Sequence, residues 1–204
     1  MRRIILIALS GAFLGACSLA VNDVPQTTPP GKFKLGLGLG NYLTYSSGEF
    51  ISLPLAGVSG RYGLNYNTDI GFRVFEAGFG LEVKRAFSEN LALALGTNLG
   101  MNTRSKQIFY QLYGTLLYGM QSIGTIPYFY VRPILNGYLG TPEEGSGFTL
   151  PAGMAIQAGF GYHGDPTSLL QPVGEVGVYV PVSGSASLQP TLILSLGLNV
   201  QFGE

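Results

Sequence analysis

A strict two-residue alternation of large apolar with small or polar side chains is the feature that most constrains this chain. In the last segment every even-numbered position from 192 to 202 is apolar, whereas Ser195, Gly197, Asn199 and Gln201 lie between them. Successive side chains of a β-strand point to opposite faces, so this period predicts strands. Comparable segments lie at about 33–40, 57–66, 70–87, 91–101, 106–120, 125–139, 150–162, 172–182 and 188–202.

The second face of these strands indicates the surrounding medium. It carries mostly glycine, alanine, serine, asparagine and glutamine, and only 11% of all residues are charged, while 31 are glycine. A soluble surface needs roughly 25–35% charged residues, which argues against a soluble barrel or sandwich. Apolar side chains outside and small or polar ones inside are typical of a transmembrane barrel. We therefore expect an all-β, closed antiparallel transmembrane β-barrel, and the formal charge of zero argues against a nucleic-acid partner.

The number of strands follows less directly. Nine segments alternate, but single-chain bacterial barrels have an even number of strands, so about ten are expected, with eight or twelve as alternatives. One route to ten adds a strand at FISLPL. The other splits 70–87, where the apolar phase switches near Glu76-Ala77-Gly78 and predicts a bulge or a hairpin. Pro133 argues against a regular strand in YFYVRPILNGY, because a closed barrel has no free edge.

The N-terminus has the features of a targeting segment. Arg2 and Arg3 precede an apolar stretch at 4–14, which is too short to span a bilayer. The following Leu14-Gly15-Ala16-Cys17 resembles the lipobox of bacterial lipoproteins. This resemblance implies cleavage before Cys17 and acylation of that cysteine. Because Ser18 replaces the aspartate that retains lipoproteins at the inner membrane, it also implies sorting to the outer membrane.

These features predict three parts of the chain: a signal peptide at 1–16, an acylated cysteine with a flexible tether at 17–31, and a barrel at 32–204. The tether carries three prolines in SLAVNDVPQTTPPG and has no periodicity, which indicates an extended linker. Cys17 is the single cysteine of the sequence, so acylation leaves none for disulfides, zinc or thiol catalysis.

The barrel portion resembles bacterial outer-membrane β-barrel proteins. The last strand, with Phe202, is similar to the aromatic-ended final strand of that class, although Gly203 and Glu204 follow it here. RYGLNYNTDIGFRVF is similar to strand–turn–strand segments of such barrels. The resemblance implies a bacterial outer-membrane location with membrane lipid as a partner, and it transfers no activity. Tyrosines suited to the membrane interfaces are Tyr42, Tyr45, Tyr62, Tyr66, Tyr110, Tyr118 and Tyr162.

If the apolar faces point outward, several charged residues point into the lumen. They are Arg61, Arg73, Glu76, Glu82, Lys84, Arg132 and Glu175. They could form salt bridges that fill the barrel, or a charged constriction that selects small solutes. Eight strands leave barely enough room for side chains and favour the first interpretation. Ten strands with glycine-lined walls shift the balance toward a narrow channel.

Catalytic signals are weak. The sequence from 159 to 164 matches G-x-G-x-x-G, but it ends a strand instead of starting a helix, so no dinucleotide site is expected. His163, the single histidine, is expected in a solvated connection near Asp165 and Ser168, with no fixed catalytic geometry. No cofactor or metal site is predicted. We expect a lipid-anchored, non-enzymatic barrel with a structural or binding role or a narrow passive pore; the alternative is a lipid-modifying enzyme that uses His163.

Overall fold

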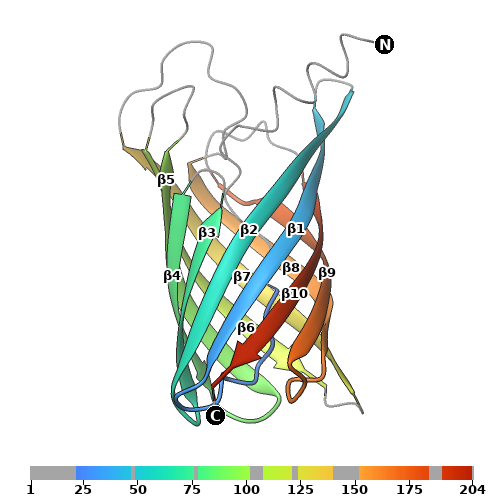
Figure 1. Cartoon of the computed structure of the whole chain (residues 1–204). Helices are drawn as coiled ribbons and strands as arrows, with labels where there is room; N and C mark the ends of the chain where they lie inside the picture. Colours follow the sequence, from blue (N-terminus) through green and yellow to red (C-terminus); the bar gives the residue numbers. More distant parts are fainter. Residues whose placement is uncertain are drawn as a thin grey trace.

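The computed structural model describes residues 22–46, 49–75, 78–101, 108–120, 124–139, 152–183 and 190–203. Ten antiparallel strands form a closed barrel, in which each strand pairs with its sequence neighbours and β1 closes against β10 (Figure 1). The predicted fold class is therefore confirmed. The strands are β1 (Phe33–Ser46), β2 (Glu49–Asn65), β3 (Thr68–Phe75), β4 (Gly78–Ala86), β5 (Leu91–Met101), β6 (Ile108–Gly119), β7 (Thr125–Leu139), β8 (Gly153–Gly164), β9 (Leu170–Pro181) and β10 (Thr191–Phe202). Among the described residues, no helix is long and apolar enough to cross a membrane.

The tenth strand arises from the phase switch in segment 70–87. Strand β3 ends at Phe75 and β4 begins at Gly78, and the two pair as an antiparallel hairpin. The hairpin reverses the chain, so the apolar residues on both sides of it can face outward despite the change from even to odd positions. The other route to ten strands is wrong, because FISLPL is the beginning of β2.

Strand β7 passes through Pro133 without ending, so the expectation of an irregular segment there is wrong. Proline has no N–H to donate to a ladder. The register of β7 with β6 skips Arg132 and Pro133 and resumes at Val131, whereas on the other side Pro133 lies opposite Ile156 of β8. Across the skipped positions, Arg132 Nε donates to Thr115 Oγ1 at 2.7 Å. A side-chain hydrogen bond therefore bridges the place where the β6–β7 register is interrupted.

Large apolar side chains cover the outside of the barrel. On β10, Leu194 and Leu196 are 40% and 72% exposed, while the intervening Ser195 is 4% exposed and faces the lumen. The same alternation places Leu35, Leu37, Phe72, Val74, Phe79, Leu81, Leu95, Leu116, Val131, Ile156, Phe160, Val176 and Val178 on the exterior. A continuous apolar outer surface around a closed sheet is what a bilayer requires of a spanning barrel.

The two ends of the barrel differ in their connections. At one end, here called the turn end, lie the start of β1, the end of β10 and the connections 66–67, 87–90, 120–124 and 165–169. The other end, here called the loop end, carries the two-residue connections 47–48 and 76–77 and the three longest connections, 102–107, 140–152 and 182–190. Transmembrane barrels have short turns on one side of the membrane and longer loops on the other, and the three longest connections here all lie at one end. In the 165–169 turn, the Thr167 hydroxyl and N–H both donate to Asp165 and lower the pKa of its carboxyl.

Exposed tyrosines lie near both ends of the barrel: Tyr62, Tyr66, Tyr118 and Tyr162 at the turn end and Tyr45 at the loop end are each at least 40% exposed. This position suits the aromatic girdle of a membrane interface. Tyr42 does not belong to a girdle, because it is 1% exposed and lies inside the barrel. It has the same inward phase on β1 as Lys34, so the sequence alternation already pointed it inward.

Candidate functional site: the occupied lumen

Residues 22–31, here called the lumenal segment, enter the barrel from the turn end, with residues 29–31 exposed at the rim and residues 22–28 inside (Figure 1). Gly31, with φ +74°, donates its N–H to Gly63 O at 2.9 Å, and Gly63 N–H donates to Lys32 O at 3.1 Å. These contacts hold the chain reversal just before β1. Inside, Val24 and Thr28 are fully buried. The proline-rich composition predicted an extended tether, but composition says nothing about what an extended segment packs against.

Lys84 of β4 is the main contact between the wall and the lumenal segment. Its Nζ donates to both carboxylate oxygens of Asp23, at 3.0 and 3.1 Å. It also donates to the carbonyl oxygens of Val24, at 2.9 Å, and Gln26, at 2.8 Å. Lys84 is 0% exposed, and its buried ammonium bonds this short stretch of chain while also lying 3.5 Å from Asp69 Oδ2.

Arg61 of β2 connects three carboxylates. Its Nη1 lies 3.0 Å from Asp23 Oδ2 and 2.7 Å from Glu82 Oε1, and its Nη2 lies 2.7 Å from Asp69 Oδ1. Arg73 of β3 reaches the other oxygen of Glu82 at 3.3 Å. The acids and bases of β2, β3 and β4 thus form one buried network with the lumenal segment. Such charges are tolerated in an interior only when they are paired and hydrogen-bonded.

Glu175 of β9 holds the inner tip of the lumenal segment on the opposite wall. Its carboxylate accepts hydrogen bonds from Asn22 N at 2.7 Å, Tyr128 Oη at 3.0 Å and Tyr130 Oη at 2.8 Å. Ser195 Oγ donates to Asn22 Oδ1 at 2.8 Å. The segment is therefore fixed to both sides of the lumen.

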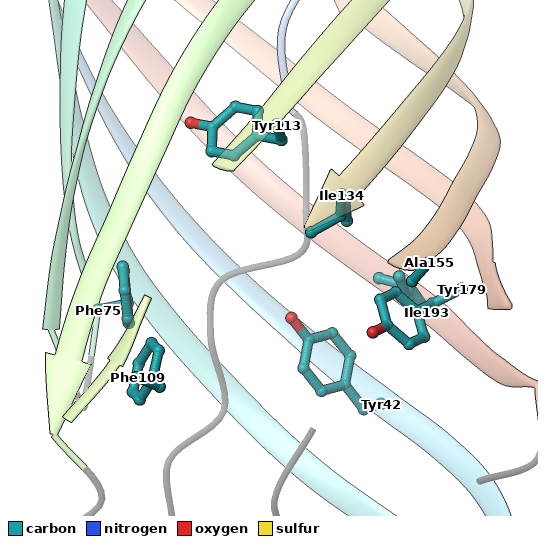
Figure 2. Close-up of a cluster of buried hydrophobic side chains, with 8 residues drawn as sticks. All are labelled: Tyr42, Phe75, Phe109, Tyr113, Ile134, Ala155, Tyr179 and Ile193. Carbon is teal, nitrogen blue, oxygen red and sulfur yellow. The ribbon is translucent and has the colours of Figure 1, made fainter. Parts of the chain in front are cut away.

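Toward the loop end the lumen becomes apolar and aromatic. Figure 2 shows eight side chains that line the wall there: Tyr42, Phe75, Phe109, Tyr113, Ile134, Ala155, Tyr179 and Ile193. The rings of Phe75 and Phe109 stack at 6.4 Å. At the border with the charged network, the guanidinium carbon of Arg132 lies 4.6 Å from the centroid of the Tyr113 ring, in cation–π geometry.

Most of the charges assigned to the lumen by sequence lie inside the barrel. Arg61, Glu82, Lys84, Arg132 and Glu175 are each at most 9% exposed, and the Arg73 guanidinium joins their network. Glu76 lies outside the described residues.

Three lumenal charges escaped the sequence analysis: Asp23, Lys34 and Asp69. Lys34 and Asp69 stand opposite Arg61 and Lys84 in the register and share their inward phase, so the alternation could have identified them. No periodic signal points to Asp23, because it precedes the strands.

His163 is not in a solvated connection, and that expectation is wrong. It lies in β8 and is 0% exposed, because the inward phase of Gly159 and Gly161 continues through it. Its Nδ1 lies 2.7 Å from Gly164 O, a carbonyl that can only accept, so Nδ1 carries the proton. Nε2 then accepts from Asn199 Nδ2 at 3.1 Å. Both ring nitrogens are therefore occupied in the lumen.

Neither a protein-family model nor a curated protein matches the sequence. Among solved structures, the chain is similar to neisserial surface protein A, with 14% identity over 84% of this chain and 99% of that one and a TM-score of 0.47. It is also similar to the N-terminal barrel domain of Pseudomonas aeruginosa OprF, with 12% identity over 86% of this chain and 100% of that one and a TM-score of 0.45. A third similar structure is an outer-membrane channel from Pseudomonas putida F1, with 11% identity over 87% of this chain and 97% of that one and a TM-score of 0.48. In its own geometry, with a closed sheet, an apolar exterior and a charged interior, the chain has the fold of a transmembrane β-barrel.

Proposed function

We propose that this protein is a self-occupied outer-membrane barrel with a structural or binding role, closed to solutes while the lumenal segment is in place. The observation that carries this proposal is the burial of Asp23 between Lys84 and Arg61, since it ties the segment into the charged network of the wall. Beside this network lies a cavity of about 70 Å³ with a lining that is part polar and part apolar. That volume suits a few water molecules.

A narrow passive pore would require the segment to leave the lumen. Single-channel recording on the full chain in planar bilayers tests this directly, against a variant that lacks residues 22–29. We expect little conductance from the full chain and discrete openings from the variant, because the deletion removes the residues that cross the charged layer. A variant that lacks residues 142–149, a deletion of the same length at the loop end, serves as the control and should stay closed. Equal conductance from the full chain and the 22–29 deletion would contradict the proposal.

We propose in addition that the protein is anchored by acylation of Cys17, which lies outside the described residues. The support is the resemblance of Leu14-Gly15-Ala16-Cys17 to a lipobox. Four residues separate Cys17 from Asn22, which makes five Cα–Cα steps and an extended length of at most about 18 Å, so the acylated cysteine would remain within that distance of Asn22. Cells grown with a labelled fatty acid should label the wild-type protein and not Cys17→Ala. Absence of label from the wild type would exclude the anchor.

A lipid-modifying enzyme that uses His163 is the alternative. His163 faces the lumen and not the lipid, and its neighbours within hydrogen-bond distance are the Gly164 carbonyl and the Asn199 amide. A nucleophile activated by a general base must lie within hydrogen-bond reach of that base. Among the described residues no such pair forms at His163, which supports the non-enzymatic proposal.

A further inference from the structure

Lys34 differs from the other lumenal cations because nothing within the described chain pairs with it. It is 5% exposed on the inner face of β1. Among the described residues, no carboxylate forms an ion pair with its Nζ, although Asp23 and Asp69 act on it from a greater distance, whereas Arg61, Arg73 and Lys84 all contact carboxylates. A buried ammonium without a partner is strongly disfavoured.

The charges around Lys34 leave one positive charge uncompensated. The surrounding network contains four cations and three carboxylates: Lys34, Arg61, Arg73 and Lys84, against Asp23, Asp69 and Glu82. Lys34 also stands directly opposite Arg61 in the β1–β2 register, so both side chains start from the same face. Like charges in such a cross-strand pair repel each other. The excess charge is therefore concentrated beside Lys34.

A cavity of about 70 Å³ adjoins Lys34. On β1 its lining includes Gly36, Gly38 and Gly40 beside Lys34, Leu37 and Leu39. A Cβ placed on Gly36 would collide with Ser59 Oγ and Asn199 Oδ1. Arg61 and Arg73 line the same cavity. Asp23 and Glu82 also line it, but their carboxylates are engaged by Lys84 and by the two arginines. The lining is part polar and part apolar, and the space is large enough for one small ion with water.

We propose that this cavity binds a small monovalent anion of about the size of chloride, held by the Lys34 ammonium and the Ser59 hydroxyl. One negative charge compensates the single excess positive charge and separates Lys34 from Arg61. The glycine-lined wall provides the room, and the small volume excludes large organic anions. Lys34 and Ser59 belong to the strands, so the site does not depend on whether the barrel conducts.

Thermal unfolding of the purified full chain in detergent, followed by heat-modifiable gel mobility, tests this site. Chloride replaces gluconate, a bulky anion, at constant ionic strength. We expect a saturable rise of the wild-type unfolding midpoint with chloride, since a ligand that binds only the folded state stabilises it. Lys34→Met should abolish the rise, and Lys32→Met, which removes a lysine at the barrel rim, should retain it. A chloride effect that is absent from the wild type or persists in Lys34→Met would overturn the proposal.

A second measurement covers the case in which Lys34→Met does not fold. Wild-type crystals grown with bromide in place of chloride should show an anomalous difference peak within about 3–4 Å of Lys34 Nζ, the range of a charge-assisted contact to a large halide. Ordered water alone in the cavity, without an anomalous peak, would also overturn the proposal.

Discussion

At the scale of single residues, the lumen depends on ionic groups that are stable only together. Lys84 is completely buried and bonded to Asp23 and to two backbone carbonyl groups of the lumenal segment. Removing one partner of such a pair leaves an uncompensated charge, which costs more than the pair itself contributes. Conversely, the exterior tolerates large apolar residues because lipid surrounds them.

Lys84→Met should therefore destabilise the folded barrel by about 3–5 kcal/mol, because Asp23 loses its ammonium partner while still buried. Equilibrium unfolding in denaturant, read from heat-modifiable mobility, measures this free energy. Arg85→Met is the matched control, since Arg85 is the next residue on β4 and is exposed. Similar losses for both variants would mean that the lysine's contacts do not stabilise the fold.

Leu196→Arg tests the outer face. Leu196 is 72% exposed on β10, and an arginine near the bilayer midplane costs about 2–4 kcal/mol. We expect a loss of that size in folding into lipid vesicles, whereas Leu196→Phe should fold as the wild type does. If the arginine variant folded equally well, this face of β10 could not lie in the lipid.

At the scale of elements, adjacent strands fit together through tyrosines that lie over glycines. Tyr128 and Tyr130 of β7 stand opposite Gly161 and Gly159 of β8, and a Cβ on either glycine would collide with the facing ring. Both tyrosine hydroxyls donate to Glu175. The glycines thus leave room for the rings, and the rings position the carboxylate that holds the lumenal segment.

Gly159→Ala should cost about 1–3 kcal/mol of stability, the usual range for overpacking, because its Cβ would displace the Tyr130 ring. Gly174→Ala on β9 is the control, since a Cβ there meets its nearest neighbour, Tyr162, at an ordinary 3.4 Å. Denaturant midpoints of the two variants in the same vesicles provide the comparison. A Gly159→Ala protein as stable as the control would show that the ring can move at little cost.

At the scale of the whole molecule, the charge of the lumen depends on whether the lumenal segment is present. Counting the described strand and segment side chains, five cations face four anions: Lys34, Arg61, Arg73, Lys84 and Arg132, against Asp23, Asp69, Glu82 and Glu175. Loss of the segment removes Asp23 and leaves five cationic side chains and three carboxylates in the lumen. The emptied barrel would thus be lined by an excess of positive charge.

The pore formed by deletion of residues 22–29 should accordingly be anion-selective. A charged lining concentrates counter-ions and excludes co-ions in a narrow channel. The reversal potential in a potassium chloride gradient measures this preference, and Arg132→Gln in the same deletion background should weaken it. A cation-selective pore would show that the strand charges do not line the conducting path.

The sequence by itself predicted a closed antiparallel membrane barrel of about ten strands, with eight or twelve left open, and the inward face of most of the lumenal charges. Those properties are local: a period of two assigns each side chain to a face, the scarcity of charge identifies the medium, and the phase switch near Gly78 marks an extra hairpin. Two local predictions from the sequence were wrong. Strand β7 continues through Pro133 because the β6–β7 ladder skips that position. Strand β8 continues through His163 because the alternation of inward and outward side chains extends further than expected. The contents of the lumen were decided only by the tertiary structure. Whether Arg61 meets Asp69, or Lys84 meets Asp23, depends on strand register and on where residues before the barrel lie. These contacts join positions as many as 61 residues apart, and no local pattern specifies them.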